Sequence, residues 1–541
     1  MAFMVVQAGT GLVRVSTDGT FASLTLPSGV TLSSTKRPRF AVLGRVVVMV
    51  NSPSVNLAIH PDLTVYPLCP LPPASAGLLA AGASTGLTGA YLVKYTAKIK
   101  DTISGDLLAE SPLGPPTNSL TAAAQSLTGT FVPISIDASV NARGVYRTTA
   151  GPTASSPYFH LFDLDDNTVT SWDDGTSDTG LGLLAEAASL GVPPGSSPGT
   201  RMQLITTWKD RLWGKAEALE TVDSVFYSEN RVAYAWPSDN ELVIPPVGQD
   251  SEGITAFVPR RNELGVARRN AFFKIQTSGA STFSVTQVIQ GKGLIAPDSV
   301  VIINDVGYGL GEDGVYAFDS DGLHSITDGT VRSWFTTDTY FNRARFTEAF
   351  ASYDPKLNTY DLHLADAATS VEDRWISYCL TNKKWYGPHK TGAFTPTVRI
   401  LARNSDGSDT PYLGSSGGFL HTMNNSTYYD VSRTPIDFDC KMIHSANTPR
   451  IEKIWLEPEI LSKVESNVSR LEVIPTIGGL DAEASDSMWH DLTLGRETLE
   501  IMGRGRFAQM RYREHTLGFR EGGQDVLIYG VELPYNEWGK M

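Results

Sequence analysis

The sequence has few cysteines and no recognisable metal-binding motif. Cys69, Cys379 and Cys440 stand far apart in the 541 residues and form no C-x-x-C pair. This spacing gives no support for a disulfide framework and fits assembly in a reducing cytosol. The nine histidines form no H-E-x-x-H or H-x-H motif, and only Cys440 and His444 place a cysteine near a histidine. We therefore expect no metal site and no cofactor.

Long apolar runs are also missing. The longest ones, such as residues 46–50 and 78–81, are far shorter than the roughly 20 residues of a membrane helix. The first residues, MAFMVVQAGTGLVRV, contain neither a basic n-region nor a small-residue cleavage site. We expect no membrane segment and no secretory leader.

Positive charge is in deficit, with 44 Lys and Arg against 58 Asp and Glu and a formal net charge of −14. Because binding to phosphates needs clustered cations, this balance disfavours general affinity for nucleic acid. A hydrophobic content of 41% is enough to bury a sizeable core. The length predicts two or three domains or one large radial architecture.

Most of the sequence consists of short runs rich in Val, Ile, Thr, Tyr, Phe and Trp. Turn-forming residues, including 49 Gly and 31 Pro, separate these runs. Helical periodicity is confined to short pieces at residues 181–190 and 342–350. The sequence therefore predicts an all-β protein.

Units of strand, glycine-containing turn and strand recur near residues 212, 309 and 412, and residues 354–363 fit a further variant of the same hairpin. Their spacing of roughly 40 to 100 residues matches one or two blades of a propeller, and six to eight blades would fit. We predict a β-propeller-like array of short antiparallel blades with an inserted fibronectin- or immunoglobulin-like β-sandwich. The predicted divisions are first propeller strands or blades at 1–73, a linker at 74–89, the sandwich at 90–192, further blades at 200–436, and a C-terminal β-region at 437–541 that closes the propeller or forms a further β-domain.

The sandwich prediction rests on strands of alternating polarity at residues 91–99, 144–148, 158–162 and 167–172. They lie within about one hundred residues, the size of a typical sandwich module. The segment resembles a fibronectin type III-like sandwich, although the pattern fits other β-sandwiches too.

One run carries a more specific resemblance. It holds, in this order, Asp210-Arg-Leu-Trp213, Val225-Phe-Tyr-Ser-Glu229, Trp236-Pro-Ser-Asp-Asn240, Gly253-Ile-Thr-Ala-Phe257, Arg261-Asn-Glu-Leu264 and Asn270-Ala-Phe-Phe-Lys-Ile275. The run is similar to the tail nozzle and packaged-DNA stabilisation proteins of short-tailed bacteriophages. In that family these strands build a propeller with an inserted sandwich, and six copies form the tube at the distal end of the tail.

The resemblance implies a structural virion protein rather than an enzyme. Its copies would form a homohexameric ring or tube, the nozzle, that retains packaged DNA and conducts it during ejection. The partners would be the tail adaptor ring, other tail proteins, and viral genomic DNA passing through the channel without sequence-specific binding. The protein would be made and assembled in the host cytoplasm and end in the virion tail.

Two sequence motifs that occur in enzymes are present, but the residues that follow them do not fit the structure that each motif requires. Gly309-Leu-Gly-Glu-Asp-Gly314 fits the phosphate-binding G-x-G-x-x-G pattern, and Gly414-Ser-Ser-Gly-Gly418 fits the G-x-S-x-G pattern of hydrolases. Both patterns need a helix to follow, whereas strand-like residues follow here, so we interpret both as turns. The alternative functions are a carbohydrate-binding or carbohydrate-cleaving propeller, with Trp334, Trp375 and Trp385 as a sugar platform, or a tail-hub or adhesin protein elsewhere in the virion.

Two groups of arginines stand out against the acidic background. Their members are Arg260, Arg261, Arg268 and Arg269, and then Arg504, Arg506, Arg511 and Arg513. Arginines could bind carboxylates of a neighbouring subunit bidentately, which is the favoured contact, or phosphates of DNA in a channel. These eight residues are the candidate contact sites, and ordinary solvated strand faces are the alternative interpretation.

Overall fold

The computed structural model describes residues 3–16, 20–84, 86–153, 155–182, 193–194, 201–218, 221–237, 239–247, 253–279, 282–390, 395–403 and 409–422, and eleven strands between residues 439 and 537. The chain divides into two compact units. The first holds residues 1–390 and 395–420, and the second holds residues 391–394 and 421–541.

Seven small antiparallel sheets make up most of the described part of the first unit. The two three-stranded ones are β1 (Phe3–Ala8), β2 (Gly11–Ser16) and β3 (Phe21–Leu24), and β33 (Pro396–Arg403), β34 (Asp409–Ser415) and β35 (Leu420–Thr422). The four-stranded ones are β4 (Arg39–Leu43), β5 (Val46–Val50), β6 (Leu57–Ile59) and β7 (Val65–Pro67); β17 (Met202–Trp208), β18 (Arg211–Ala216), β19 (Ser224–Tyr227) and β20 (Glu241–Val243); β21 (Ile254–Pro259), β22 (Glu263–Arg268), β23 (Ala271–Thr277) and β24 (Phe283–Gln290); β25 (Val301–Ile303), β26 (Val306–Leu310), β27 (Val315–Asp319) and β28 (Gly322–Ser325); and β29 (Phe350–Asp354), β30 (Thr359–Leu364), β31 (Arg374–Cys379) and β32 (Lys384–Lys390).

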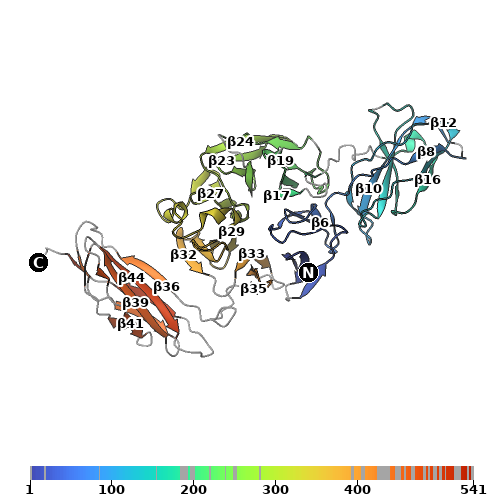
Figure 1. Cartoon of the computed structure of the whole chain (residues 1–541). Helices are drawn as coiled ribbons and strands as arrows, with labels where there is room; N and C mark the ends of the chain where they lie inside the picture. Colours follow the sequence, from blue (N-terminus) through green and yellow to red (C-terminus); the bar gives the residue numbers. More distant parts are fainter. Residues whose placement is uncertain are drawn as a thin grey trace. The chain divides into compact units, whose positions relative to one another are not determined.

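The sheets follow one another around a ring (Figure 1). The first strand of each sheet contacts the first strand of the next, in the order β4, β17, β21, β25, β29 and β33. The first strands therefore line the centre and the later strands lie further out, which is the arrangement of a β-propeller. The predicted all-β, propeller-like fold is confirmed, and the number of sheets falls within the predicted six to eight.

Apolar side chains fill the spaces between neighbouring sheets of the ring. Leu204, Trp213 and Val225 of the β17–β20 sheet pack against Leu264 and Phe273 of the β21–β24 sheet. Similar apolar clusters join the β21–β24 sheet to β25–β28, and β25–β28 to β29–β32. No sheet of three or four strands has a core of its own, so each is stable only because it buries its faces against its neighbours.

Buried charged side chains lie between the β29–β32 and β33–β35 sheets. Arg399 of β33 has its Nη1 2.6 Å from Asp361 Oδ2 and its Nη2 3.1 Å from Asp354 Oδ2. All three side chains are at most 3% exposed. His363, on the same face of β30 as Asp361, is also fully buried. We call Arg399, Asp354 and Asp361 the ionic clasp, which joins the two sheets at this boundary.

The inserted sandwich lies between β7 and β17 in the sequence. Its strands are β8 (Leu78–Ala81), β9 (Leu87–Tyr91), β10 (Val93–Lys100), β11 (Leu107–Glu110), β12 (Leu120–Gln125), β13 (Leu127–Thr130), β14 (Ala142–Arg147), β15 (Phe159–Leu164) and β16 (Ser171–Asp174). One sheet has the order β11-β10-β14-β15, which contains the C–F–G order of immunoglobulin-like sandwiches. Trp172 and Tyr95 meet in its core.

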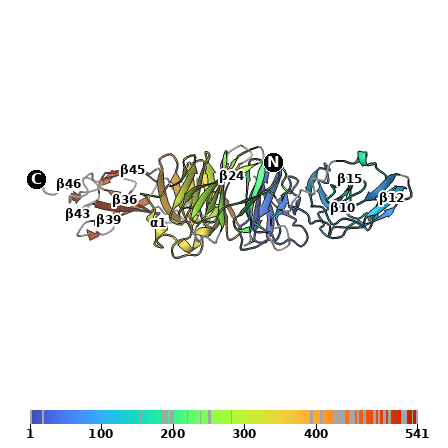
Figure 2. The same ribbon diagram turned by 90° about the horizontal axis from the view of Figure 1, so that it is seen from above.

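The sandwich begins earlier than the sequence predicted. The residues assigned to a linker, 74–89, contain β8 and the first part of β9, and β8 pairs with β13. Small residues such as Gly82 resemble a linker in composition. Gly82 is in fact closely surrounded, since an added Cβ would lie 2.1 Å from Ser126 Oγ. Figure 2 shows the sandwich strands β10, β12 and β15 in the view turned by 90°.

The second unit is a separate β-domain in the part that the structure describes. Its strands are β36 (Asp439–His444), β37 (Lys453–Trp455), β38 (Glu459–Val464), β39 (Ser469–Gly478), β40 (Glu483–Ala484), β41 (Met488–Asp491), β42 (Arg496–Thr498), β43 (Gly503–Gly505), β44 (Phe507–Thr516), β45 (Val526–Glu532) and β46 (Tyr535–Glu537). They pair among themselves, with β45 on β38. Of the two predictions for residues 437–541, the further β-domain agrees with this pairing.

Helical segments are short and lie in connections. They are η1 (Asp178–Gly180), η4 (Pro297–Ser299), α1 (Ser333–Thr336) and η5 (Arg343–Glu348). The helical segment predicted at 342–350 contains η5. Of the other predicted helical segment, 181–190, residues 183–190 lie outside the described residues. Within the described segments, none of the helices has the length and apolar character needed to span a bilayer.

We predict that Arg399→Met lowers the free energy of unfolding by about 3–5 kcal/mol, because it removes the buried cation that Asp354 and Asp361 share. Urea denaturation followed by tryptophan fluorescence measures the change. The matched control is Arg231→Met, which removes an exposed arginine paired with Asp210 and is expected to have no measurable effect. Equal stability of the two variants would contradict a stabilising role for the clasp.

Candidate functional site

The four arginines predicted between residues 260 and 269 do not form one patch. Arg260 and Arg261 follow β21 and lie at one end of β22, whereas Arg268 and Arg269 lie at its other end. At about 3.4 Å per residue, the two pairs are separated by roughly 20 Å. The two pairs are close in the sequence but lie at opposite ends of one strand.

Arg260 is engaged within the ring. It forms an ion pair with Glu263, and its Nε donates to the backbone oxygen of Asp305 at 2.6 Å. Its guanidinium also lies 5.1 Å from the ring centre of Phe318. These contacts join the β21–β24 sheet to the β25–β26 turn. Arg261 has an exposed side chain, and its backbone N–H donates to Asp305.

Arg268 is buried and joins two sheets of the ring. Its Nη1 lies 2.5 Å from Asp223 Oδ1, in the segment before β19. Arg269 lies 3.4 Å from Glu312. Of these four arginines, Arg261 therefore has the side chain most exposed to solvent. Its contact with a neighbouring subunit or with DNA stays a prediction.

The arginines of the second unit are described only in part. Arg504 lies on β43, and Arg511 and Arg513 lie on β44. Arg506 lies outside the described residues. The role of these arginines in contact with a partner also remains a prediction.

The sequence analysis missed a cluster at the centre of the ring. Arg39, on β4, binds Asp298 through Nε at 2.7 Å and through Nη2 at 3.1 Å. Arg37 reaches the same carboxylate at 3.3 Å and donates to the backbone oxygen of Glu348 at 2.9 Å. We call Arg37, Arg39 and Asp298 the central clasp.

The position of the central clasp follows from the order of the sheets. Asp298 lies on η4, immediately before β25, and two sheets, β17–β20 and β21–β24, separate β25–β28 from the β4 sheet. Arg39 and Asp298 both lie near the centre of the ring, on sheets that are not neighbours. They can meet only across the middle of the ring. The central clasp therefore crosses the centre of the ring with charges of the chain itself.

Local structure holds Asp298 in place. Pro297 fixes the start of η4, and Ser299 Oγ donates to the backbone oxygen of Ala296 at 2.7 Å. Ser299 Oγ also accepts the N–H of Leu310, and the Ser299 carbonyl accepts the hydroxyl of Tyr360. Hydrogen bonds from the β25–β28 and β29–β32 sheets thus hold the segment that places the Asp298 carboxylate next to Arg37 and Arg39.

Burial opposes the ionisation of Asp298, but Arg39 and Arg37 outweigh it and hold the pKa of the carboxyl below its usual value. The two-pronged contact with Arg39 is of the strong charge-assisted kind. An ionised carboxylate held by two arginines is poorly suited to accept or deliver a proton near neutral pH. The cluster is therefore built to hold the ring together rather than to perform acid–base chemistry.

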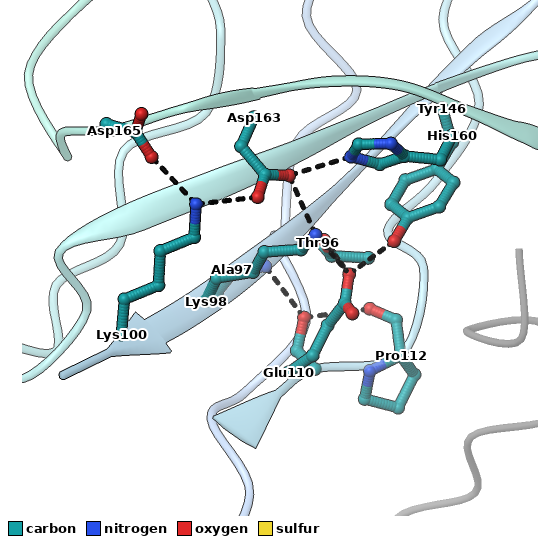
Figure 3. Close-up of polar contacts among 11 residues, drawn as sticks. Thr96, Ala97, Lys98, Lys100, Glu110, Pro112, Tyr146, His160, Asp163 and Asp165 are labelled. Carbon is teal, nitrogen blue, oxygen red and sulfur yellow. Dashed lines mark hydrogen bonds and ion pairs between the residues drawn. The ribbon is translucent and has the colours of Figure 1, made fainter. Parts of the chain in front are cut away.

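A second charged network lies in the sandwich (Figure 3). Lys98 of β10 lies between two carboxylates, 2.7 Å from Asp163 and 3.4 Å from Glu110. Lys100 bridges Asp163 and Asp165 at 2.7 Å each. His160 also contacts Asp163, and Tyr146 donates its hydroxyl to Glu110 at 2.7 Å. These bonds join β10, β11, β14 and β15.

The pKa shifts in this network also oppose catalysis. Burial raises the pKa of Asp163, but bonds from His160, Lys100 and Lys98 outweigh it and lower the pKa well below its usual value. Burial, with Glu110 next to it, raises the pKa of Tyr146 far above normal. Asp163 thus stays ionised and Tyr146 stays neutral at physiological pH, so neither is tuned for proton transfer.

The other sequence candidates occupy structural positions. The glycine motif at 309–314 joins β26 to β27, and the motif at 414–418 joins β34 to β35, so both are turns, as predicted. Trp334, Trp375 and Trp385 are each half-buried. They pack on other aromatic rings, Trp334 against Tyr340, Trp375 against His363, and Trp385 against Tyr378.

Comparison with known proteins identifies no family. No known family pattern matches the sequence, and no curated protein resembles it. Solved structures that align in part include AztD of Citrobacter koseri, which is 8% identical, with 61% of this chain and 94% of AztD covered and a TM-score of 0.24. PorZ of Porphyromonas gingivalis is 9% identical, with 99% and 80% covered and a TM-score of 0.27. An exo-β-1,3-galactanase of Phanerochaete chrysosporium is 10% identical, with 81% and 99% covered and a TM-score of 0.19. These likenesses are too weak to indicate a function.

We predict that Asp298→Asn lowers the free energy of unfolding of the ring by about 3–5 kcal/mol, since Arg37 and Arg39 lose their shared counter-charge. The midpoint of urea unfolding measures the loss. Asp321→Asn, in the exposed β27–β28 turn, is the control and is expected to leave the midpoint unchanged. An unchanged midpoint in Asp298→Asn would show that the central clasp contributes nothing to stability.

We also predict a pH-dependent effect of Asp163→Asn. Because the folded state lowers the pKa of Asp163, the stabilisation is complete above the ordinary pKa of about 3.9 and is lost as the pH falls through the lower folded-state value. The variant should be less stable than the wild type by about 1.5–3 kcal/mol at pH 7. The difference should shrink below about pH 4.

Thermal unfolding between neutral and acidic pH tests this expectation. The control is Asp165→Asn, whose carboxylate is 77% exposed and should contribute much less. A difference between Asp163→Asn and the wild type that stays constant down to strongly acidic pH would contradict the assignment.

Proposed function

We propose that this chain is a structural subunit of a short-tailed phage tail, and that its copies assemble into the nozzle ring that retains packaged DNA and conducts it during ejection. The proposal combines the family resemblance of residues 204–275 with one structural observation: the ion pairs of the central clasp span the middle of the propeller. A DNA conduit cannot run through a single ring that is crossed in this way. It has to run between copies, around the symmetry axis of an assembly.

The distribution of charge supports a mechanical role. The described acidic and basic side chains with the greatest burial, such as Asp354, Arg268 and Lys98, are used in ion pairs within the chain. Such pairs fix the geometry of a scaffold, and they lower the pKa of Asp298 and of Asp163, so that both carboxylates stay ionised near neutral pH. The net charge of −14 suits a conduit wall, since it repels the phosphate backbone and lets DNA slide.

The assembly would be a homohexamer in the virion tail that contacts the tail adaptor ring. Arg261 is exposed at the β21–β22 turn and is the candidate of the 260–269 group for contact with a neighbouring subunit. The alternative, a sugar-binding propeller, gains no support from the three tryptophans, because each packs on protein aromatic rings.

We predict that the purified full chain forms a ring of cyclic symmetry at micromolar concentration. Light scattering after size exclusion gives the copy number, and negative-stain imaging gives the symmetry. Arg261→Glu should weaken assembly at least about tenfold without lowering the thermal midpoint, because the side chain is exposed. Arg231→Glu, another exposed arginine, is the control.

Two results would count against the proposal. One is a chain that stays monomeric at all accessible concentrations. The other is a monomer that binds defined oligosaccharides on a glycan array, which would favour the carbohydrate-binding alternative.

A further inference from the structure

A histidine and two aspartates meet where the sandwich joins the ring. His60 follows β6, Asp62 lies in the β6–β7 turn, and Asp101 follows β10 of the sandwich. One ligand atom from each side chain lies within 4.8 Å of the others. The three residues are therefore close enough to hold a single ion.

Backbone hydrogen bonds fix the two aspartates in place. In the β6–β7 turn, His60 N–H donates to the Thr64 carbonyl at 3.0 Å, and Asp62 Oδ1 accepts the N–H of Thr64 at 2.8 Å. Asp101 Oδ1 accepts the N–H groups of Ile103 and Ser104 at 2.8 Å each. Oδ2 of Asp101 is left facing His60. Such outer contacts orient carboxylate ligands before a metal arrives.

The distances fit a small tetrahedral ion. Nδ1 of His60 lies 3.2 Å from Asp62 Oδ1 and 3.4 Å from Asp101 Oδ2. A tetrahedral zinc ion with bonds of about 2.0–2.1 Å keeps its ligands about 3.3–3.4 Å apart. The spacing between the imidazole and each carboxylate is thus the spacing that zinc imposes.

The contacts of His60 Nδ1 are with the two carboxylates. Nδ1 is shielded from solvent and lies between Asp62 Oδ1 and Asp101 Oδ2. The ion pairs of Asp62 and Asp101 among the described residues are with His60, and none of them involves a lysine or an arginine. Two carboxylates that converge on one shielded imidazole nitrogen form a site whose negative charge a divalent cation would balance.

We propose that His60, Asp62 and Asp101 form a divalent metal site of the zinc type, with water as the fourth ligand. One imidazole and two carboxylates suit zinc better than calcium, which takes six to eight oxygen ligands. Because His60 and Asp62 belong to the ring and Asp101 belongs to the sandwich, the ion would fasten the sandwich to the β4–β7 sheet. This proposal is independent of the proposed function.

The competing explanation is a protonated His60 that pairs with both aspartates without any metal. Direct titration separates the two. The full chain is treated with a chelator and dialysed. One metal-free sample is titrated with Zn²⁺ by calorimetry, and another is titrated with Co²⁺ as a spectroscopic probe of coordination. We expect one tight Zn²⁺ per chain, the intense visible absorption of tetrahedral Co²⁺, and a higher thermal midpoint in the presence of Zn²⁺.

Variants locate the site. His60→Ala and Asp62→Asn should each weaken Zn²⁺ binding at least about 100-fold and abolish the rise in thermal midpoint. Asp106→Asn removes the same charge from the β10–β11 turn that follows Asp101 but lies outside the cluster, so it should bind Zn²⁺ like the wild type. Circular dichroism of each metal-free variant checks that it is folded.

The proposal is overturned if the wild type takes up no Zn²⁺, or if His60→Ala and Asp62→Asn bind Zn²⁺ as tightly as the wild type does. The second result would place the ion at other histidines or at a cysteine. A loss of thermal stability in His60→Ala that is the same with and without Zn²⁺ would assign the cluster to a simple ion pair.

Discussion

The contact between Arg39 and Asp298 is the interaction on which the ring most depends, because it connects sheets that are not neighbours. Each sheet of the ring buries its faces only against the next one, and such pairwise packing alone leaves the ring free to open or shear. Arg39 also donates to the Gln203 carbonyl of β17 at 2.8 Å, so three sheets meet at one guanidinium. A buried ion pair adds little net stability over apolar packing, but its fixed geometry selects one arrangement.

The same principle appears at two other boundaries. Arg399 joins the last two described sheets of the ring, and Lys98 connects strands of the sandwich. At each of these places a cation contacts carboxylates from different strands. These charged residues therefore contribute to holding the ring and the sandwich in shape.

Sequence patterns predicted the strands and turns well because those depend on local residues. The glycines at 309 and 314 predicted a turn, and Gly314, with φ of 158°, makes it. The alternation at residues 359–364 shows the limit of such patterns. Asp361 and His363 alternate with Tyr360 and Leu362, as on a half-exposed strand, yet all four are buried. The polar face is covered because β33 supplies Arg399, and nothing near residue 361 in the sequence announces that partner.

The charged clusters were beyond prediction for the same reason. Arg39 and Asp298 are 259 residues apart, and neither belongs to a motif. His60 and Asp62 are two residues apart, but Asp101, the third member of their cluster, comes from a different domain. A search by spacing finds ligands only when one short segment supplies them. Conversely, Arg260 and Arg268 look like one basic group in the sequence, and a single strand separates them in space.

Apolar and charged contacts together hold the sandwich against the ring at the junction between the two. The chain leaves the ring after β7 and returns at β17, so the sandwich is tethered to two neighbouring sheets. Ala97 and Ile99 of β10 pack with Leu68, Leu212 and Trp236 of the ring. Apolar contacts of this kind resist separation but only weakly resist rotation. The directional contact at His60 and Asp101, which lies just beyond Ile99, supplies the missing constraint on rotation.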